Sequence, residues 1–423
     1  MRPIKTDNAQ LAQPLLTKRT ANERSSLMPS GSYGNLELTC LFTVCMLEGA
    51  DTALLPSALY ALQRDLGLTL QALAMMSMGQ AVAACAFAPV WGIMADRRVA
   101  PKRVLLVTGC IIQGLVTATL ARIDALLPLL ILRIINGAAL ASLGPISKSM
   151  LAESVPAQRR GRAFSLLTSA VDFGRLLGFF CCIQLASREV LGMQGWRVAF
   201  MLMGSLAVFA GVLAFFCIQD REDKTAPSAG KLGDEWLRLR SYMKIATFWI
   251  IVIQGCFGSM PWCAFGYNIL FFQTAGLSIN ESSALVAAFQ ICCMLGQLVG
   301  GVVGDTLELK SPGHGRAFTA QISVFSGIPL VLFMYLAPST SSYYFLQQLL
   351  VVITTGFLAT WCASGVNAPI LCEIVDVKSC TSVMAWESAL EGSFASFFGN
   401  MSVGLLGQLV FGYHLPKEGD EIS

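Results

Sequence analysis

Charged side chains are scarce in this sequence: Asp, Glu, Lys and Arg make up only 13% of its 423 residues, whereas 55% of the residues are hydrophobic. This balance excludes an ordinary soluble globular protein. Histidine occurs only twice, and the cysteines lack the spacing of metal ligands. A phosphate-binding loop and a nucleophile with its base are also missing from the pattern, so we expect no enzyme, no metal and no bound cofactor.

Long apolar segments take the place of these features. A helix needs roughly 20 mainly apolar residues to cross about 30 Å of hydrocarbon. The segments lack the alternation of barrel strands, and a helix satisfies its backbone hydrogen bonds internally, so we predict an all-α membrane protein. Eleven windows qualify, at about 36–62, 70–94, 103–121, 125–147, 163–186, 198–218, 246–273, 282–304, 317–337, 343–371 and 382–412.

Lysine and arginine are distributed unevenly between the loops. With the N-terminus in the cytosol, the cytosolic side holds 22 of the 29 basic residues and the other side holds five, while Arg133 and Arg175 lie within spans. The positive-inside rule therefore predicts an integral multi-pass protein with a cytosolic N-terminus, in an organelle that the pattern does not identify. We divide the chain into a disordered cytosolic tail, a six-helix bundle, a cytosolic linker, a second bundle of five spans and a polar tail, at 1–34, 35–218, 219–245, 246–412 and 413–423.

The two halves look like copies of one another. A Gly-x-x-x-Asp sequence stands at 92–96 after the second span and again at 301–305 after the eighth, and Glu153 after the fourth span is matched by Glu373 after the tenth. We therefore predict two six-helix repeats. The second repeat is one span short. Either its last helix is absent or the sequence is truncated, and we favour truncation because five helices leave one face of the bundle unpacked.

The repeated Gly-x-x-x-Asp sequence predicts a conformational latch on the cytosolic side. A glycine lets two helices approach closely, and an aspartate near a helix end can be held by basic groups in one conformation and released in another. We expect the latch to consist of Gly92, Asp96, Arg97, Arg98, Arg103, Arg160, Arg162, Gly301 and Asp305.

These motifs resemble those of the major facilitator superfamily of secondary transporters. Residues 92–98 resemble its loop signature, and Arg133 followed by Gly137 resembles its buried arginine with a packing glycine. Residues 156–163 and 195–197 resemble two further landmarks, in the expected order. The resemblance implies the major facilitator fold and alternating-access transport.

The second half is similar to the spinster-like branch of this superfamily, in particular its plant and algal members. The similarity lies in residues 254–262, 304–305, 313–316 and 321–323. It implies export of sphingolipids or lysolipids, often with proton coupling. Leu140, however, stands where animal spinsters carry an acidic residue, which argues against their mechanism of lipid export.

Ionisable residues inside the spans are the main candidates for function. Each costs about 2.5–3.5 kcal/mol at a helix centre, so it must face a partner, the bundle interior or water. Glu48 and Asp51 share a face of the first span, Arg133 lies in the fourth, and Asp172 and Arg175 lie three apart in the fifth. We expect Asp51 and Arg133 to pair in a proton-sensitive way, whereas Asp172 and Arg175 form either a functional pair or a static one.

Further candidates come from the second half. Glu387 and Glu391 stand four apart in the eleventh span and belong either to a cation path or to the membrane interface. Polar and aromatic residues near the midplane are candidates for lining a substrate cavity, although packing explains such residues equally well. They are Trp262, Tyr267, Gln290 and Gln297.

We therefore predict a secondary transporter that moves a small organic solute or an amphipathic lipid, with protons as the candidate coupling ion. Its expected partners are the lipid bilayer, the substrate and H⁺, with no nucleic acid. The alternative is a non-transporting membrane sensor with a transporter fold, although the long cytosolic domain expected of a sensor is missing. No Gly-Pro run occurs in the fifth span, which favours a symporter or uniporter over an antiporter.

Overall fold

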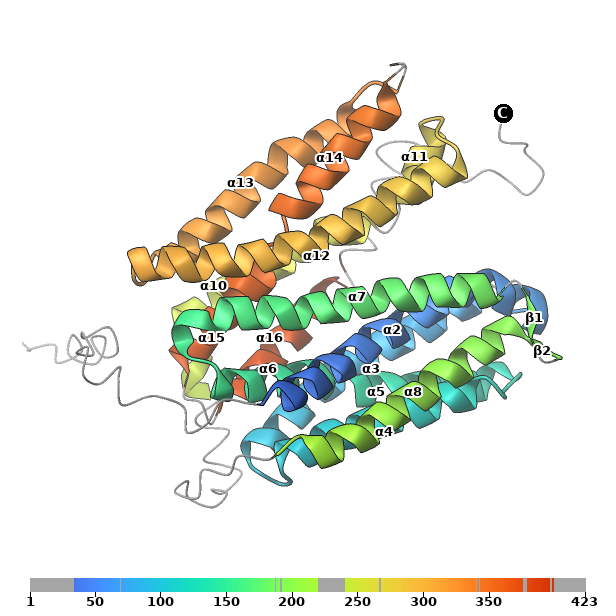
Figure 1. Ribbon diagram of the computed structural model, residues 1–423, viewed down its shortest axis with the longest axis horizontal. Helices are drawn as coiled ribbons and strands as arrows, with labels where there is room; N and C mark the ends of the chain where they lie inside the picture. Colours follow the sequence, from blue (N-terminus) through green and yellow to red (C-terminus); the bar gives the residue numbers. More distant parts are fainter. Residues whose placement is uncertain are drawn as a thin grey trace, which may run out of the picture.

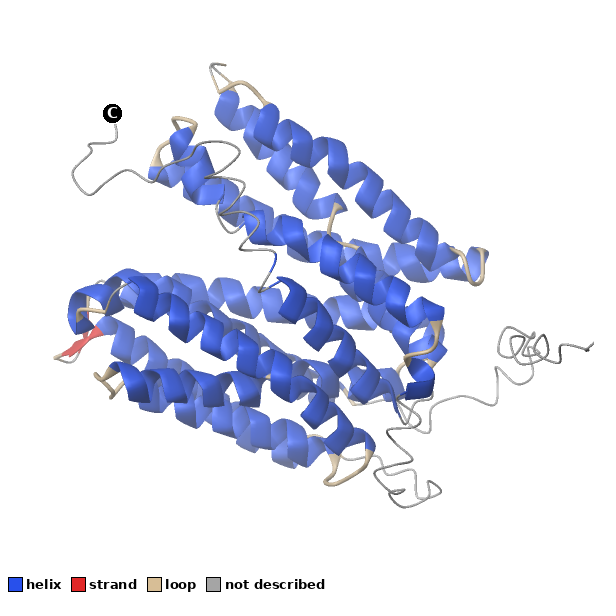
Figure 2. Ribbon diagram, turned by 180° about the vertical axis from the view of Figure 1, so that it is seen from behind, coloured by secondary structure: helices blue, strands red, loops and turns tan. Residues whose placement is uncertain are grey.

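The structure is a computed structural model that describes residues 34–219 except 69, 187 and 191, residues 240–339 except 266 and 267, and residues 341–398 except 342, 376–378, 396 and 397. Apart from one antiparallel hairpin, β1 (Glu189–Val190) with β2 (Met193–Gln194), the regular elements of this part of the chain are helices (Figures 1 and 2). The predicted terminal tails and most of the linker lie outside the described residues.

The helices of the first half run from α2 to α8. They are α2 (Asn35–Leu66), α3 (Leu70–Asp96), α4 (Lys102–Leu120), α5 (Leu126–Leu140), α6 (Leu143–Ser154), the short η2 (Ala157–Arg159), α7 (Arg160–Ala186) and α8 (Gly195–Cys217). Helices α5 and α6 follow one another so closely that residues 126–154 form a single span.

The second half contains the helices from α10 to α16. They are α10 (Ala246–Phe265), α11 (Asn268–Thr274), α12 (Ile279–Lys310), α13 (Gly315–Leu336), α14 (Tyr344–Leu358), the π-helical η3 (Ala363–Asn367), α15 (Ala368–Ile374) and α16 (Cys380–Phe394).

Nine helical stretches of the described residues are long and apolar enough to cross a membrane. They coincide with nine of the eleven predicted windows. The other two windows, 246–273 and 382–412, contain α10 with α11 and α16. The predicted all-α membrane fold is confirmed, while the question of a twelfth span falls on residues beyond 398, outside the described part of the chain.

The outer surface of the bundle is apolar. Large side chains such as Phe216, Phe325 and Leu336 are exposed by 70% or more. In water such exposed apolar surface would cause aggregation, but lipid tails are as apolar as these side chains. The surface therefore fits a protein dissolved in a bilayer.

Within the first half, small residues let the helices approach closely. A Cβ atom on Gly174 of α7 would lie 1.7 Å from the Met46 carbonyl oxygen of α2, and one on Gly49 would lie 1.9 Å from the Val171 carbonyl oxygen. These distances are far below van der Waals contact, so only glycine fits at either position. Helix α2 is thereby held against α7.

The two halves meet mainly at one end of the bundle, here called the closed end, where α3 and α12 terminate. One hydrophobic cluster crosses between the halves there and includes Leu151 and Phe164 with Leu371 and Met384. Toward the opposite, far end, the core separates into one cluster for each half. Figures 1 and 2 show α12 diverging from α7 toward the far end, where β1 and β2 lie.

Candidate functional site

Asp96 ends α3 at the closed end and binds the start of a helix from the other half. Its Oδ2 accepts a hydrogen bond of 2.6 Å from the backbone N–H of Ser382 in the first turn of α16. The unpaired N–H groups and the dipole of a helix N-terminus favour such a carboxylate. A Cβ on Gly92 would lie 2.8 Å from Ala385 Cβ, so the glycine is what lets α3 and α16 meet. We call this contact the first latch.

Lys102 is the basic side chain beside the first latch, although the predicted latch residues did not include it. Its Nζ donates to Glu153 Oε1 at 2.5 Å and to Ser149 Oγ at 2.6 Å. Ser149 Oγ in turn accepts a hydrogen bond of 2.7 Å from the hydroxyl of Thr381, in the second half. A continuous set of polar contacts therefore joins the two halves next to Asp96.

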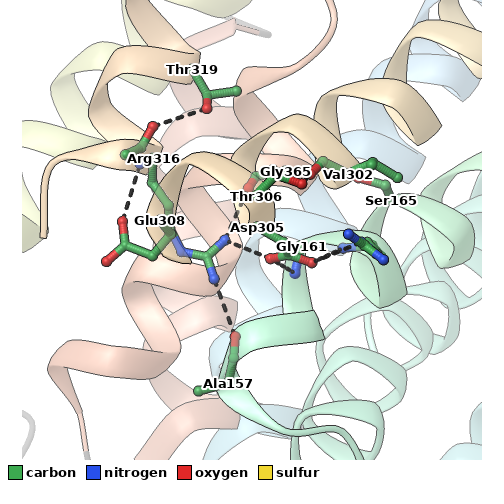
Figure 3. Close-up of polar contacts among 12 residues, drawn as sticks. Ala157, Gly161, Ser165, Val302, Asp305, Thr306, Glu308, Arg316, Thr319 and Gly365 are labelled. Atoms are coloured by element: carbon green, nitrogen blue, oxygen red, sulfur yellow. Dashed lines mark hydrogen bonds and ion pairs between the residues drawn. The ribbon is translucent and has the colours of Figure 1, made fainter. Parts of the chain in front are cut away.

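Asp305 forms the corresponding contact on the other side, which we call the second latch (Figure 3). Its carboxylate is almost fully buried and accepts hydrogen bonds of 3.0 and 2.9 Å from the backbone N–H groups of Gly161 and Arg162, in the first turn of α7. Arg316 Nη1 lies 3.2 Å from Asp305 Oδ1. A Cβ on Gly301 would lie only 2.4 Å from a side-chain oxygen of α7. Both predicted Gly-x-x-x-Asp sequences thus bind the start of a helix from the opposite half.

Arg316 links the second latch to its surroundings. Its side chain is only 2% exposed, and its guanidinium lies 3.4 Å from the carboxylate of Glu373. It also donates to the carbonyls of Ala157 and Gly365, at 3.2 and 3.3 Å. Sequence reasoning recorded Arg316 only as part of a family resemblance and missed this role.

The five arginines predicted for the latch have different positions. Arg162 approaches the Asp305 carboxylate, with 3.9 Å between Nε and Oδ2. Arg103 and Arg160 instead donate to backbone carbonyls within the first half. Arg97 is half-buried, and Arg98 is exposed with a φ of 52°. Arg162 is thus a predicted latch arginine that the structure brings to a latch aspartate.

A cavity of about 310 Å³ lies where the two halves meet, within the size range of small-molecule sites. Its polar lining consists of Lys148 from α6, Ser259 from α10, and Glu387, Ser388 and Glu391 from α16. Glu387 and Glu391 were predicted to belong either to a cation path or to the membrane interface, and the structure places both on this cavity.

The prediction counted Lys148 among the basic residues of the cytosolic loops, and the structure corrects this assignment. The polar run around it, with Ser147 and Ser149, resembles a loop, but residues 143–154 continue the fourth span as α6. Lys148 therefore lies within the fourth span rather than in a loop.

A series of electrostatic interactions runs from Lys148 on the cavity wall to charged residues of the first and fifth spans. Glu48 is half-buried and within electrostatic reach of Lys148 and Arg175. Arg175 forms an ion pair of 2.7 Å with Asp172 on the same helix. The other oxygen of Asp172 accepts a hydrogen bond of 2.7 Å from Gln297 of α12, so this predicted pair also contacts the second half.

Asp51 and Arg133 are both buried in the first half, but no ion pair within 4.0 Å joins them among the described residues. Instead, three polar side chains connect them. The hydroxyl of Thr117 donates to Asp51, the amide of Asn136 donates to Thr117 at 3.0 Å, and Gln80 contacts both Asn136 and Arg133, at 2.7 and 3.3 Å. Instead of a direct pair between Asp51 and Arg133, the structure has a relay, a series of hydrogen bonds through the three intervening side chains.

The remaining predicted cavity residues have weaker links to this site. Trp262 is 39% exposed and lies against the rings of Phe265 and Phe289, at centroid distances of 5.3 and 6.0 Å. Gln290 is half-buried on α12. Tyr267 lies outside the described residues. Of the four candidates, Gln297 alone contacts a charged residue through a described hydrogen bond.

Comparison with known proteins agrees with this architecture. The sequence model of the family described as Major Facilitator Superfamily matches residues 41–409. The chain is 24% identical to the probable sulfoacetate transporter SauU of Cupriavidus necator, over 85% of this chain and 82% of that protein. It is 22% identical to NiaP of Bacillus subtilis, a candidate niacin/nicotinamide transporter, over 85% and 86% of the two chains. The crystal structure of the transporter FucP in the outward conformation covers 89% of this chain and 92% of its own, with a TM-score of 0.67 and 12% identity.

Proposed function

The chain belongs to the major facilitator superfamily, and from this premise we propose that it moves a small organic solute or an amphipathic lipid across a bilayer by alternating access, with proton coupling. The cavity at Lys148, Glu387 and Glu391 is the proposed binding site. The N-terminus is proposed to be cytosolic, so the closed end faces the cytosol.

The observation that carries this proposal is the position of the contacts between the halves. Two latches close one end of the bundle, a cavity with charged side chains lies beyond them, and the cores of the halves separate toward the far end. A carrier that rocks around a central site needs such an arrangement in one of its two states. The half-buried carboxyl groups that line the cavity supply candidate proton sites.

Membership of the spinster-like branch is also proposed, on residues 254–262, 304–305, 313–316 and 321–323. A cavity of about 310 Å³ accommodates a small solute or a lipid headgroup, whereas a complete lysolipid needs further space for its chain. We therefore place small solutes ahead of lipids as the cargo.

The test is an uptake screen with the purified full chain in proteoliposomes, with and without a pH gradient, using organic anions, sugars and lysolipids. Uptake that depends on the gradient is expected for at least one class. Asp51→Asn and Arg133→Gln serve as matched variants and are expected to abolish uptake while the protein still reaches the membrane. Unchanged uptake by both variants would remove the relay from the mechanism, and binding without transport in every class would favour the sensor alternative.

A further inference from the structure

Lys148 presents a positive charge to the cavity that no described ion pair within 4.0 Å neutralises. It lies on α6, is half-buried, and lines the cavity from the side of the first half. Among the residues that the structure describes, its ammonium group has no hydrogen bond and no ion pair within 4.0 Å. An ammonium group has three donors, which water or a bound ligand must accept from in this cavity. A ligand with acceptor oxygens would satisfy them.

The two glutamates opposite Lys148 can satisfy each other. Glu387 and Glu391 are one helical turn apart on α16, and both line the cavity. Two carboxylates at this spacing repel, so a proton on one of them relieves the repulsion. Neither glutamate therefore needs a cation from the cargo, in contrast to Lys148, which needs an anion.

The charges around the cavity also connect the cargo to protons. Glu48, Glu387 and Glu391 lie within electrostatic reach of Lys148, and Glu48 also lies within reach of Arg175, which pairs with Asp172. An added anion would increase the negative charge inside the bilayer, which is costly. Uptake of a proton by the carboxyl groups offsets that charge, so an anion and a proton enter the site most favourably together.

The other titratable side chains that face α16 here are Cys256 of α10 and Cys85 of α3. Cys256 Sγ contacts the Leu390 carbonyl, and Cys85 Sγ lies 3.1 Å from the Cβ position of Gly392. Protonated thiols add no charge to the balance. At the start of α16, Asp96 and Lys102 belong to the first latch rather than to the cavity.

We propose that the cavity binds a small organic anion, a carboxylate or a sulfonate, whose oxygens accept hydrogen bonds from Lys148, while Glu387 and Glu391 hold the proton that enters with it. This inference rests on the proposed transport function and adds its substrate class. A cationic cargo would face the ammonium of Lys148 across the same cavity and be repelled.

The first test needs no knowledge of the substrate. Ser259→Cys places a thiol on the cavity wall opposite Lys148, and its modification rates by a negatively and a positively charged methanethiosulfonate are compared, with the chain lacking that thiol as background. We expect Lys148→Met to lower the ratio of anionic to cationic rates by about tenfold, because a nearby charge acts on each reagent with opposite sign. Lys310→Met, at an exposed position on α12, should leave the ratio unchanged. An unchanged ratio in Lys148→Met overturns the proposal.

The second test uses three pyridine probes of similar size: nicotinate, neutral nicotinamide and 3-picolylamine, together with sulfoacetate. Binding or uptake in proteoliposomes is expected for an anion, with loss of at least tenfold in Lys148→Met and partial recovery in Lys148→Arg. Uptake of the neutral or amine probe without any anion would overturn the anion assignment while leaving the transport function in place. If none of the probes is taken up, the result counts against the transport function. The ratio of anionic to cationic modification rates then decides the role of Lys148 independently.

Discussion

The two latches use the same Gly-x-x-x-Asp sequence but differ in how firmly the aspartate is held. Asp96 accepts one backbone hydrogen bond, from Ser382, and the nearby Lys102 bonds to Glu153 instead. Asp305 accepts two backbone hydrogen bonds and has Arg316 at 3.2 Å. The difference indicates that the two repeats share the position of this contact but not its strength. We therefore expect the first latch to release before the second.

The comparison is tested most severely by removing the basic side chain nearest to each aspartate. Arg316→Met leaves the buried Asp305 with only the more distant Arg162, so we expect a loss of about 3–5 kcal/mol in the free energy of unfolding. Lys102→Met removes a pair whose side chains are 14% and 33% exposed, and about 1 kcal/mol is expected. Urea unfolding of the purified variants in detergent measures both losses. Equal losses would contradict the proposed difference between the latches.

Removal of the aspartates themselves should open the closed end to different degrees. A hydrogen bond to a charged group contributes about 1.5–3 kcal/mol, and each 1.4 kcal/mol corresponds to about tenfold in an equilibrium. Asp305→Ala should therefore raise the labelling rate of a buried thiol at Ser165→Cys by about 100-fold, and Asp96→Ala by about tenfold.

Labelling is measured with a membrane-impermeant maleimide in proteoliposomes. The controls are the Ser165→Cys variant with both latch aspartates intact and the chain without the added cysteine. A larger effect of Asp96→Ala would reverse the order of release.

The glycines of the two latches offer a subtler contrast. A methyl group at 301 would lie 2.4 Å from Ser165 Oγ, whereas one at 92 would lie 2.8 Å from Ala385 Cβ. Overpacking typically costs about 1–3 kcal/mol, so both Gly301→Ala and Gly92→Ala should favour opening of the closed end in the same labelling assay. Gly258→Ala is the control, since its new atom would meet only the end of the flexible Gln254 side chain at 3.4 Å.

The smallest effects are expected in the loops that follow the two aspartates. Arg98 has a φ of 52° and Gly313 a φ of 83°, a region in which side chains with a Cβ are strained by about 1–2 kcal/mol. Arg98→Gly should therefore raise the thermal unfolding temperature slightly, and Gly313→Ala should lower it. Shifts of the unfolding temperature in the same direction for both variants would show that backbone strain at these two positions does not determine the stability.

Most of the fold could be predicted from the sequence because hydrocarbon imposes a simple requirement. Each span must be long, apolar and helical, and nine predicted windows coincide with such helices. The two latch aspartates were also predictable, because a Gly-x-x-x-Asp sequence recurs at the same place in both halves. Motifs of this kind consist of a few neighbouring residues and can therefore be recognised from the sequence alone.

The partners of these residues could not be predicted in the same way. Lys148 lies in a polar run that is indistinguishable from a loop until α6 is seen to continue the span. Arg316 reaches Asp305 only because α12 and α13 are joined by a tight turn. Asp51 and Arg133 were expected to pair directly, but the side chains between them come from three other positions. These features depend on tertiary packing rather than on local sequence.

Both latch aspartates bind main-chain N–H groups, which every amino acid except proline provides. Side chains at positions 162 and 382 can therefore diverge between related proteins without loss of these backbone hydrogen bonds, whereas position 161 requires glycine because a Cβ there would lie 2.6 Å from Asp305 Oδ1. At 162 and 382 the main requirement is the absence of proline, so a conventional substitution score would misjudge whether a homologue keeps these contacts.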